Sequence, residues 1–253
     1  MQLKNLCLSL LLGVVLYGSL YSGEKPPCPK KNFLIGNSLT WDTIPELLGD
    51  DTQWHVDCGK PLPYIFENPE KPCVKSSNIW PKALAGHQFD QVSFQPHYGS
   101  NLASDLRTIS QWIDLQPDAE IIIHTGWAFH ADRQEEFTNP VVCNDVMQHS
   151  PVYFNALLKK LQDKYPTRTI RRTYAMDLLQ LAHQDILDGK SPINSVAELY
   201  RDKIHMTHEG GRYLMHNAMR HALGQPFSSV GFSKTPKELK VYLDSLLQRT
   251  YSK

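Results

Sequence analysis

The sequence lacks an excess of charge of either sign, because 26 basic and 26 acidic residues among 253 leave a formal net charge of zero. A global field that would attract nucleic acid is therefore excluded, and no nucleic-acid partner is expected. Hydrophobic residues make up 41% and aromatic residues 10% of the chain, which excludes an intrinsically disordered protein. The length allows one core of ordinary size. These numbers leave an enzyme or a binding domain.

Cysteine is scarce, and the five residues present are too few for a small disulfide scaffold. Cys7 lies in an apolar run from Leu6 to Leu16, which is too short to span a membrane comfortably and is followed by small residues. We therefore expect residues 1–23 to be a signal peptide, cut near residues 18–23. The chain 24–253 would then be secreted or periplasmic, without a membrane span. An uncleaved N-terminal anchor is the alternative.

Removal of the signal peptide leaves four cysteines, and an even number in an exported protein suggests disulfides. They are Cys28, Cys58, Cys73 and Cys143. Four cysteines allow three pairings, of which Cys58 with Cys73 is the local one, and the pairing stays open. A zinc site is the alternative, but the chain has no C-x-x-C pair and its spacings fit no zinc finger. No metal or cofactor is expected.

Short apolar runs alternate with amphipathic segments along most of the chain. Strands are expected at 33–35, 54–57, 89–95, 121–123 and 169–175. Helices are expected at 39–48 with an interruption at Pro45, at 104–115 with Ser104 as a cap, and at 153–165, 177–187, 195–200, 209–223 and 236–251. The alternation predicts a single three-layer α/β/α domain with a mostly parallel sheet over residues 24–253. The proline-rich stretch 60–88 and the polar stretch 128–150 are left without elements.

Several catalytic motifs are missing. There is no G-x-S-x-G, so the nucleophile elbow of the α/β-hydrolases is absent, and no G-x-G-x-x-G or phosphate loop occurs. His208-Glu209 begins like H-E-x-x-H, but Arg212 stands where the second histidine would be, which excludes that zinc motif. A metal cluster of His205, His208 and His216 is disfavoured because His216 lies well inside an expected helix.

The first positive signal is Gly36-Asn37-Ser38-Leu39, which lies between the first expected strand and a helix. Functional groups of parallel sheets gather at the carboxyl ends of the strands, so Ser38 would present its hydroxyl at that edge. Gly36 allows a sharp turn there. The plain alternative is a helix cap, since Asn and Ser are both good N-cap residues.

The second signal is Asp202-Lys203-Ile204-His205, just before the helix expected at 209–223. A histidine three residues after an aspartate can share one face of a turn with it. Asp202 could then accept a hydrogen bond from one imidazole nitrogen, which leaves the other nitrogen to take a proton from a serine. A D-x-x-H pattern by itself is common and usually structural.

Taken together and in this order, the two patterns resemble the SGNH/GDSL hydrolase family of esterases and lipases. That family has a Gly-Asp-Ser-Leu-like block after the first strand and an Asp-x-x-His block near the C-terminus. Here Asn37 replaces the aspartate of the first block, and the resemblance spans roughly residues 31–224. It implies a catalytic triad of Ser38, His205 and Asp202 and an acyl-enzyme intermediate.

The resemblance also implies an oxyanion hole. The family's second block supplies a glycine N–H, for which Gly59 is the best match. Its third block is normally Gly-x-Asn-Asp, and Gly99-Ser100-Asn101 matches the first three positions while Leu102 replaces the aspartate. Gln95 lies closer to the end of its strand and carries an equivalent amide. Gln95 and Asn101 both remain candidates for the side-chain donor, with Gln95 preferred.

By this resemblance the protein is expected to be a secreted serine esterase whose substrate is a small-molecule or carbohydrate ester, with acetyl or another short acyl group. An acyltransferase with the same triad is a close variant. The alternative of another class is a non-catalytic binding domain on the same scaffold. His97, Tyr98, Trp127 and His130 are candidates to line the pocket. The sequence assigns no oligomeric state.

Overall fold

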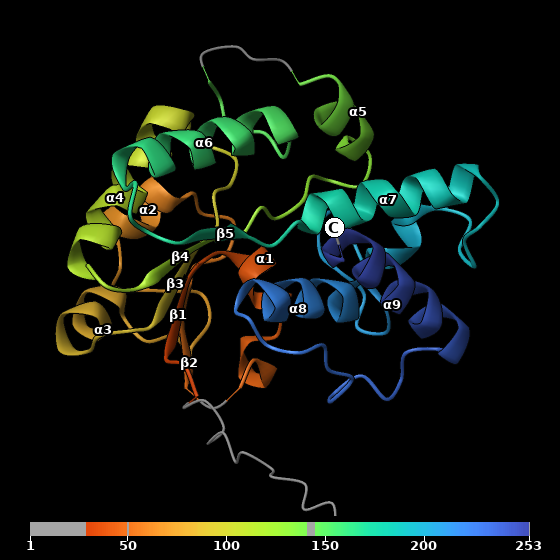
Figure 1. Cartoon of the computed structure of the whole chain (residues 1–253), viewed down its shortest axis with the longest axis horizontal. Helices are drawn as coiled ribbons and strands as arrows, with labels where there is room; N and C mark the ends of the chain where they lie inside the picture. Colours follow the sequence, from red (N-terminus) through yellow and green to blue (C-terminus); the bar gives the residue numbers. More distant parts are fainter. Residues whose placement is uncertain (1–28, 50, 141–144, 253) are drawn as a thin grey trace, which may run out of the picture.

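The structure is a computed structural model, and it describes residues 29–49, 51–140 and 145–252 (Figure 1). The predicted signal peptide lies outside the described residues, as do Cys28 and Cys143. No helix in the described part of the chain combines the length and the apolar character that crossing a membrane would require.

A five-stranded sheet forms the centre of the fold, and every strand pairs parallel to its neighbours in the order β2-β1-β3-β4-β5. The strands are β1 (Asn32–Gly36), β2 (Thr52–Val56), β3 (Gln91–Phe94), β4 (Glu120–Ile123) and β5 (Ile170–Arg172). In this register Ile35 of β1 lies opposite His55 of β2 and Phe94 of β3. The predicted α/β fold class with its parallel sheet is confirmed.

Helices connect the strands and cover both faces of the sheet. They are α1 (Ser38–Trp41), α2 (Leu62–Glu67), α3 (Trp80–Gly86), α4 (Leu102–Leu115), α5 (Arg133–Thr138), α6 (Pro151–Lys164), α7 (Ala175–Leu187), α8 (Gly211–Ala222) and α9 (Lys237–Tyr251). Two short 3-10 helices, η1 (Pro45–Leu47) and η2 (Val196–Leu199), interrupt the loops.

Each face of the sheet has its own core because successive strand residues point to opposite sides. Phe33 and Ile35 of β1 pack with α2, α3, α4 and α6, around the buried ring of Trp112. Leu34 and Ile122 face the other way and pack against Met219 and the end of α8. Figure 1 shows this separation, with α2, α4 and α6 on one side of the sheet and α8 on the other. Helices α7, α8 and α9 form a further cluster behind that face.

The strand order indicates the edge of the sheet at which a ligand would bind. The chain runs from β1 outward to β2 and then returns past β1 to β3, so the loops after β1 and β3 diverge from one point. In parallel sheets of this order, ligands bind beyond the carboxyl ends of the strands at that switch point. Ser38 directly follows β1 and Gln95 directly follows β3, so both residues lie there.

Several sequence expectations need correction. The stretch 60–88 contains α2 and α3, whose Pro63 and Pro81 lie in the first turn, where proline costs no hydrogen bond. The polar stretch 128–150 contains α5. Ser104 is not the N-cap of α4, because Asn101 caps it and Ser104 completes the capping box.

A disulfide joins Cys58 to Cys73, with their Cα atoms 5.6 Å apart. It is the local pairing among the three that the sequence allowed. The bridge lies just beyond β2, and the Cys58 N–H also donates to Cys73 Sγ. It therefore closes the segment that begins with Gly59 and ties it to the carboxyl end of the sheet.

Candidate active site

The turn after β1 holds Ser38 in a defined orientation. Asn37 is the N-cap of α1, and its side-chain oxygen accepts the Leu39 N–H at 3.0 Å. Gly36 is required by close approach, because a Cβ at that position would lie 2.2 Å from Thr40 Oγ1 and 2.8 Å from Gln95 Cβ. Ser38 itself is partly exposed at the start of α1. Its N–H belongs to the first turn and has no acceptor within the helix.

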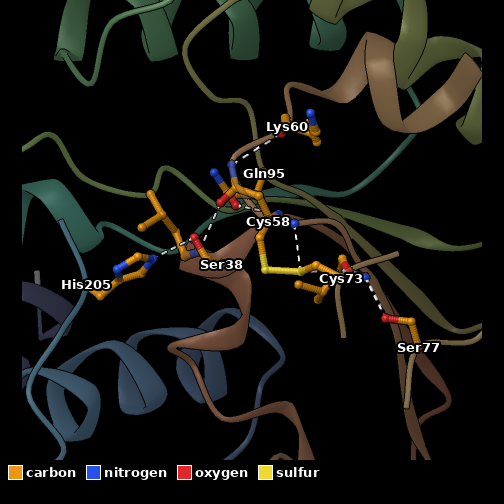
Figure 2. Close-up of a disulfide and its surroundings, with 10 residues drawn as sticks. Ser38, Cys58, Lys60, Cys73, Ser77, Gln95 and His205 are labelled. Atoms are coloured by element: carbon orange, nitrogen blue, oxygen red, sulfur yellow. Dashed lines mark hydrogen bonds between the residues drawn. A yellow bond between two sulfur atoms is a disulfide. The ribbon is translucent and has the colours of Figure 1, made fainter. Parts of the chain in front are cut away.

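The structure brings His205 onto Ser38, although 167 residues separate them. His205 Nε2 lies 2.9 Å from Ser38 Oγ (Figure 2). On the other side of the ring, His205 Nδ1 lies 2.9 Å from Asp202 Oδ2 and 3.0 Å from Oδ1. An ionised carboxylate only accepts hydrogen bonds, so Nδ1 carries the proton and Nε2 is left as the acceptor for the Ser38 hydroxyl.

Asp202 is held in its charged form by its own loop. Its Oδ1 accepts the backbone N–H of Ile204 at 2.9 Å and that of His205 at 2.8 Å. Burial raises the pKa of the Asp202 carboxyl, but these backbone donors and the His205 ring outweigh burial and lower the pKa to about 2. The carboxylate is therefore ionised throughout the neutral range.

The loop that carries Asp202 and His205 is anchored by the segment after β4. The Trp127 indole N–H donates to the Ile204 carbonyl at 2.6 Å, and the backbone N–H of His130 donates to the Lys203 carbonyl at 3.0 Å. Trp127 is fully buried. It therefore supports the loop from the protein interior and does not line an open pocket. A surface pocket of about 420 Å³ lies next to this contact, lined by Phe129, His130, Ala131, Asp132 and Lys203.

Gln95 is the oxyanion candidate that touches the Ser38 turn. Its side-chain oxygen accepts the Asn37 N–H at 3.0 Å and the Thr40 hydroxyl at 3.3 Å. Its side-chain nitrogen donates to the Pro96 carbonyl at 2.9 Å. Because an amide nitrogen has two hydrogens, one N–H of Gln95 is left over. Figure 2 shows the Gln95 amide beside Ser38.

The other two oxyanion candidates lie in different settings. Gly59 is exposed and has a positive φ of 67°. The next residue of its turn, Lys60, accepts a hydrogen bond at its carbonyl from Asn37 Nδ2 at 3.3 Å. Asn101 instead accepts the Ser104 N–H at 2.9 Å in the α4 capping box. No hydrogen bond joins Asn101 to the Ser38 turn among the described residues.

A second polar cluster, formed by His97, Tyr98, Glu136 and His149, borders the site. The Tyr98 hydroxyl donates to Glu136 at 2.6 Å, and the Glu136 carboxylate also accepts the His149 N–H at 2.9 Å. The His97 and His149 rings lie 5.8 Å apart between centroids. Burial is the main cause that lowers the pKa of His97 to about 3, and the charges of His149 and His205 act in the same direction. His97 is therefore neutral at ordinary pH.

Sequence reasoning missed the residues that connect the two halves of the site. Asp42, at the end of α1, binds both Arg201 and Arg212. The only available signal was an aspartate one helical turn after Ser38. In the sequence, Arg212 stands out only because it breaks an H-E-x-x-H pattern. Of the histidines considered as metal ligands, His208 Nδ1 contacts the Arg212 side chain at 3.2 Å and His216 Nδ1 contacts the Thr43 carbonyl at 2.7 Å.

The described part of the chain holds no group of three or more His, Cys, Asp or Glu side chains arranged to bind a metal ion.

Comparison with protein-family models gives no match, and comparison with curated protein sequences gives none. Among solved structures, an acetyl xylan esterase from Butyrivibrio proteoclasticus is 10% identical, with a TM-score of 0.36, covering 57% of this chain and 55% of that one. The salicylyl-acyltransferase SsfX3 from a tetracycline biosynthetic pathway is 12% identical, with a TM-score of 0.44, covering 84% and 58%. A possible lipase from Chitinophaga pinensis DSM 2588 is 13% identical, with a TM-score of 0.46, covering 81% and 100%.

The chain thus spans little more than half of the first two matched structures. At these identities and scores the similarity adds no argument about activity. The resemblance to the SGNH/GDSL family continues to rest on the residues of this chain and on how they lie together.

Proposed function

We propose that this protein is a serine esterase in which Ser38 is the nucleophile, His205 the general base and Asp202 the residue that orients His205. The observation that carries the proposal is the chain of contacts from Asp202 to His205 Nδ1 at 2.9 Å and from His205 Nε2 to Ser38 Oγ at 2.9 Å. Both distances are within the range that proton transfer requires.

In the proposed reaction, Ser38 Oγ attacks the ester carbonyl carbon while its proton passes to His205 Nε2. The resulting imidazolium is stabilised by the Asp202 carboxylate. When the tetrahedral intermediate collapses, His205 returns the proton to the leaving alcohol and an acyl-enzyme forms on Ser38. Water then attacks the acyl-enzyme with His205 again as base, releasing the acid and restoring the serine.

The negative charge on the tetrahedral oxygen needs donors. We assign the N–H groups of Ser38 and Gly59 and the remaining side-chain N–H of Gln95 to this role. Gln95 is preferred to Asn101 because its amide lies against the Ser38 turn, whereas Asn101 caps α4. Each donor of this kind is worth roughly 3–4 kcal/mol in the transition state.

The substrate class in this proposal is an ester of acetyl or another short acyl group, with a carbohydrate alcohol as the leaving group, as the SGNH/GDSL resemblance implies. The pocket of about 420 Å³ beside Lys203 offers room for that alcohol at the edge of the His205 loop. We also propose that the protein is exported, which the Cys58–Cys73 disulfide supports, since structural disulfides persist in oxidising compartments. The mass of the mature protein would locate the predicted cut near residues 18–23.

The test is turnover of p-nitrophenyl acetate, butyrate and octanoate and of an acetylated oligosaccharide. Ser38→Ala and His205→Ala are each expected to lower kcat at least about 1,000-fold. Ser104→Ala is the matched control, because Ser104 is also partly exposed at a helix start, and it should keep full activity. Unchanged turnover in Ser38→Ala would remove that serine as the nucleophile. An added alcohol that captures the acyl group in preference to water would identify an acyltransferase.

A further inference from the structure

Asp42 lies one helical turn after Ser38 and is completely buried. It is the C-cap residue of α1, and its N–H donates to the Ser38 carbonyl at 3.0 Å. Its side chain reaches the loop that carries His205, where it contacts Met206 and Arg201. Burying a carboxylate costs free energy of folding unless hydrogen-bond donors surround it, so the role of Asp42 depends on the donors that it binds.

Three residues supply those donors, and all of them come from the C-terminal part of the chain. Asp42 Oδ2 accepts the Met206 N–H at 2.7 Å. Asp42 Oδ1 lies 3.0 Å from Arg201 Nη1, 2.8 Å from Arg212 Nε and 2.7 Å from Arg212 Nη2. Arg201 belongs to the His205 loop, whereas Arg212 belongs to α8. Asp42 therefore joins α1 to the loop and to α8 at one point.

These contacts close a ring around the reacting atoms. The Ser38 carbonyl accepts a hydrogen bond from the Asp42 N–H, and the Asp42 side chain accepts one from the Met206 N–H. Met206 directly follows His205 in the chain. His205 Nε2 completes the ring at Ser38 Oγ. The separation of 2.9 Å between these two atoms thus depends on where Asp42 holds the loop.

Arg201 extends the connection to the third member of the proposed triad. Its guanidinium contacts the Met206 carbonyl as well as Asp42, and its Nε lies 3.9 Å from Asp202 Oδ2. Its backbone N–H donates to the His205 carbonyl at 2.8 Å. One arginine therefore lies between the buried carboxylate of Asp42 and the exposed carboxylate of Asp202.

We propose that Asp42 is a positioning residue for the reaction of Ser38, acting through the His205 loop with Arg201 and Arg212 as its partners. The proposal rests on the proposed esterase function. The hydrogen bonds of the Asp42 side chain go to Arg201, Met206 and Arg212 and not to the Ser38 hydroxyl or the His205 ring, so its effect is on the alignment of the two. A displacement of about 1 Å between a nucleophile and its base can cost about 100-fold in rate.

The competing explanation is that Asp42 is only a stabilising buried ion pair. Asp185 provides the matched control, because it is also buried and binds one arginine, with Arg249 Nη1 at 3.1 Å from its Oδ1. Asp185 lies in α7, outside the connection between Ser38 and His205. Asp42→Asn and Asp185→Asn should therefore both reduce stability, but only Asp42→Asn should slow the reaction of folded enzyme.

The experiment measures kcat and KM for p-nitrophenyl acetate per folded, active protein. Asp42→Asn is expected to lower kcat about 10- to 100-fold with KM changed less than about 3-fold, and Asp185→Asn to change neither. Introduced into His205→Ala, Asp42→Asn should cause no further loss, because it acts through His205. Unchanged kcat in Asp42→Asn, or an equal loss with and without His205, would overturn the proposal. If Asp42→Asn does not fold, Arg201→Gln takes its place, because Arg201 is exposed and its replacement is easier to tolerate. The expected loss in kcat is then smaller, about 5- to 20-fold.

A crystal structure of Asp42→Asn separates this proposal from the esterase function itself. The distance between His205 Nε2 and Ser38 Oγ should lengthen from 2.9 Å to beyond hydrogen-bond range. A distance that stays the same would contradict the positioning role. If the wild-type protein hydrolyses no ester, the function proposed above is wrong, and this distance still decides whether Asp42 holds the loop.

Discussion

The side-chain oxygen of Gln95 accepts the backbone N–H of Asn37 at 3.0 Å, so the residue after β3 holds the turn after β1. Both side chains are completely buried. This contact crosses the switch point of the sheet and orients the side-chain amide of Gln95, because the Asn37 N–H can meet only an acceptor. The Gln95 nitrogen is thereby directed away from Asn37, toward the Pro96 carbonyl.

Replacing Gln95 by methionine keeps the volume and removes every polar contact. We expect kcat to fall about 100-fold, because a proposed oxyanion donor is lost, and stability to fall because Asn37 and Pro96 lose buried partners. Gln91→Met is the control, since Gln91 is equally buried and begins β3, whereas Gln95 follows the end of that strand. It should destabilise the fold and leave kcat unchanged. Steady-state kinetics with thermal unfolding would check both, and equal kcat values for the two variants would contradict the role of Gln95.

Asn37→Asp restores the residue usual in the family's first block but removes a donor. Asn37 Nδ2 donates to the Lys60 carbonyl at 3.3 Å, and a carboxylate there would face that carbonyl oxygen. We expect the free energy of unfolding to fall by about 1–3 kcal/mol and kcat to fall with it, because the turn that carries Gly59 loses its anchor. Asn37→Ser also loses the donor to the Lys60 carbonyl but keeps the cap and adds no charge, so it separates the loss of that contact from the repulsion between the new carboxylate and the carbonyl oxygen. Urea denaturation at pH 8 measures the difference, and equal stability of wild type and Asn37→Asp would refute it.

The Cys58–Cys73 disulfide should contribute to stability through the loop it closes. A loop of 15 residues corresponds to about 3 kcal/mol in the chain-entropy model. We expect a reductant, or the double variant Cys58→Ser/Cys73→Ser, to lower the free energy of unfolding by about 2–4 kcal/mol. Any response of the double variant to the reductant measures the other cysteines. This contribution would be ruled out if the urea midpoint of the wild-type protein were unchanged by the reductant and equal to that of the double variant.

Asp105 in α4 should make stability depend on pH. Burial raises the pKa of its carboxyl to about 7, while hydrogen bonds from Tyr153 and Ser100 act in the opposite direction. The folded state therefore holds this proton more tightly than the unfolded state, whose pKa is about 3.9. Stability is highest below about pH 4 as far as this group is concerned, declines as pH rises toward 7, and is level above.

Asp105→Asn removes that proton equilibrium while keeping the shape of the side chain. The variant should match the wild type near pH 4 and exceed it by about 2–4 kcal/mol at pH 8. Urea denaturation at pH 4.5, 6 and 8 gives the difference, in which all other titrating groups cancel. A difference that is the same at every pH would show that Asp105 titrates normally.

The sequence predicted a helix or strand where the residues of that segment alone determine its structure. Ile121–Ile123 was recognisable because a strand buried on both faces is a continuous apolar run. Residues 62–67 and 80–86 were not recognisable as helices because their prolines suggested loops, although proline in a first turn is compatible with a helix. Helix α5 has only six residues and was hidden in a polar stretch.

The residues of the candidate site likewise fall into those that the sequence could identify and those that only the structure reveals. Ser38 and the Asp202–His205 pair each form a short pattern, so sequence alone could nominate them. Asp42 could not be nominated, because its partners Arg201 and Arg212 lie 159 and 170 residues away. The choice between Gln95 and Asn101 likewise depends on which amide faces the Ser38 turn, and spacing in the sequence does not contain that information.

The most direct test of the central claim is to find the atom that reacts. The protein is incubated with a fluorophosphonate, digested, and analysed by peptide mass spectrometry. The account predicts one phosphonyl group per chain, on the peptide that contains Ser38, formed at least about 1,000-fold more slowly in His205→Ala. A phosphonyl group on another residue, or none on the native protein, would contradict the assignment of Ser38 as the nucleophile.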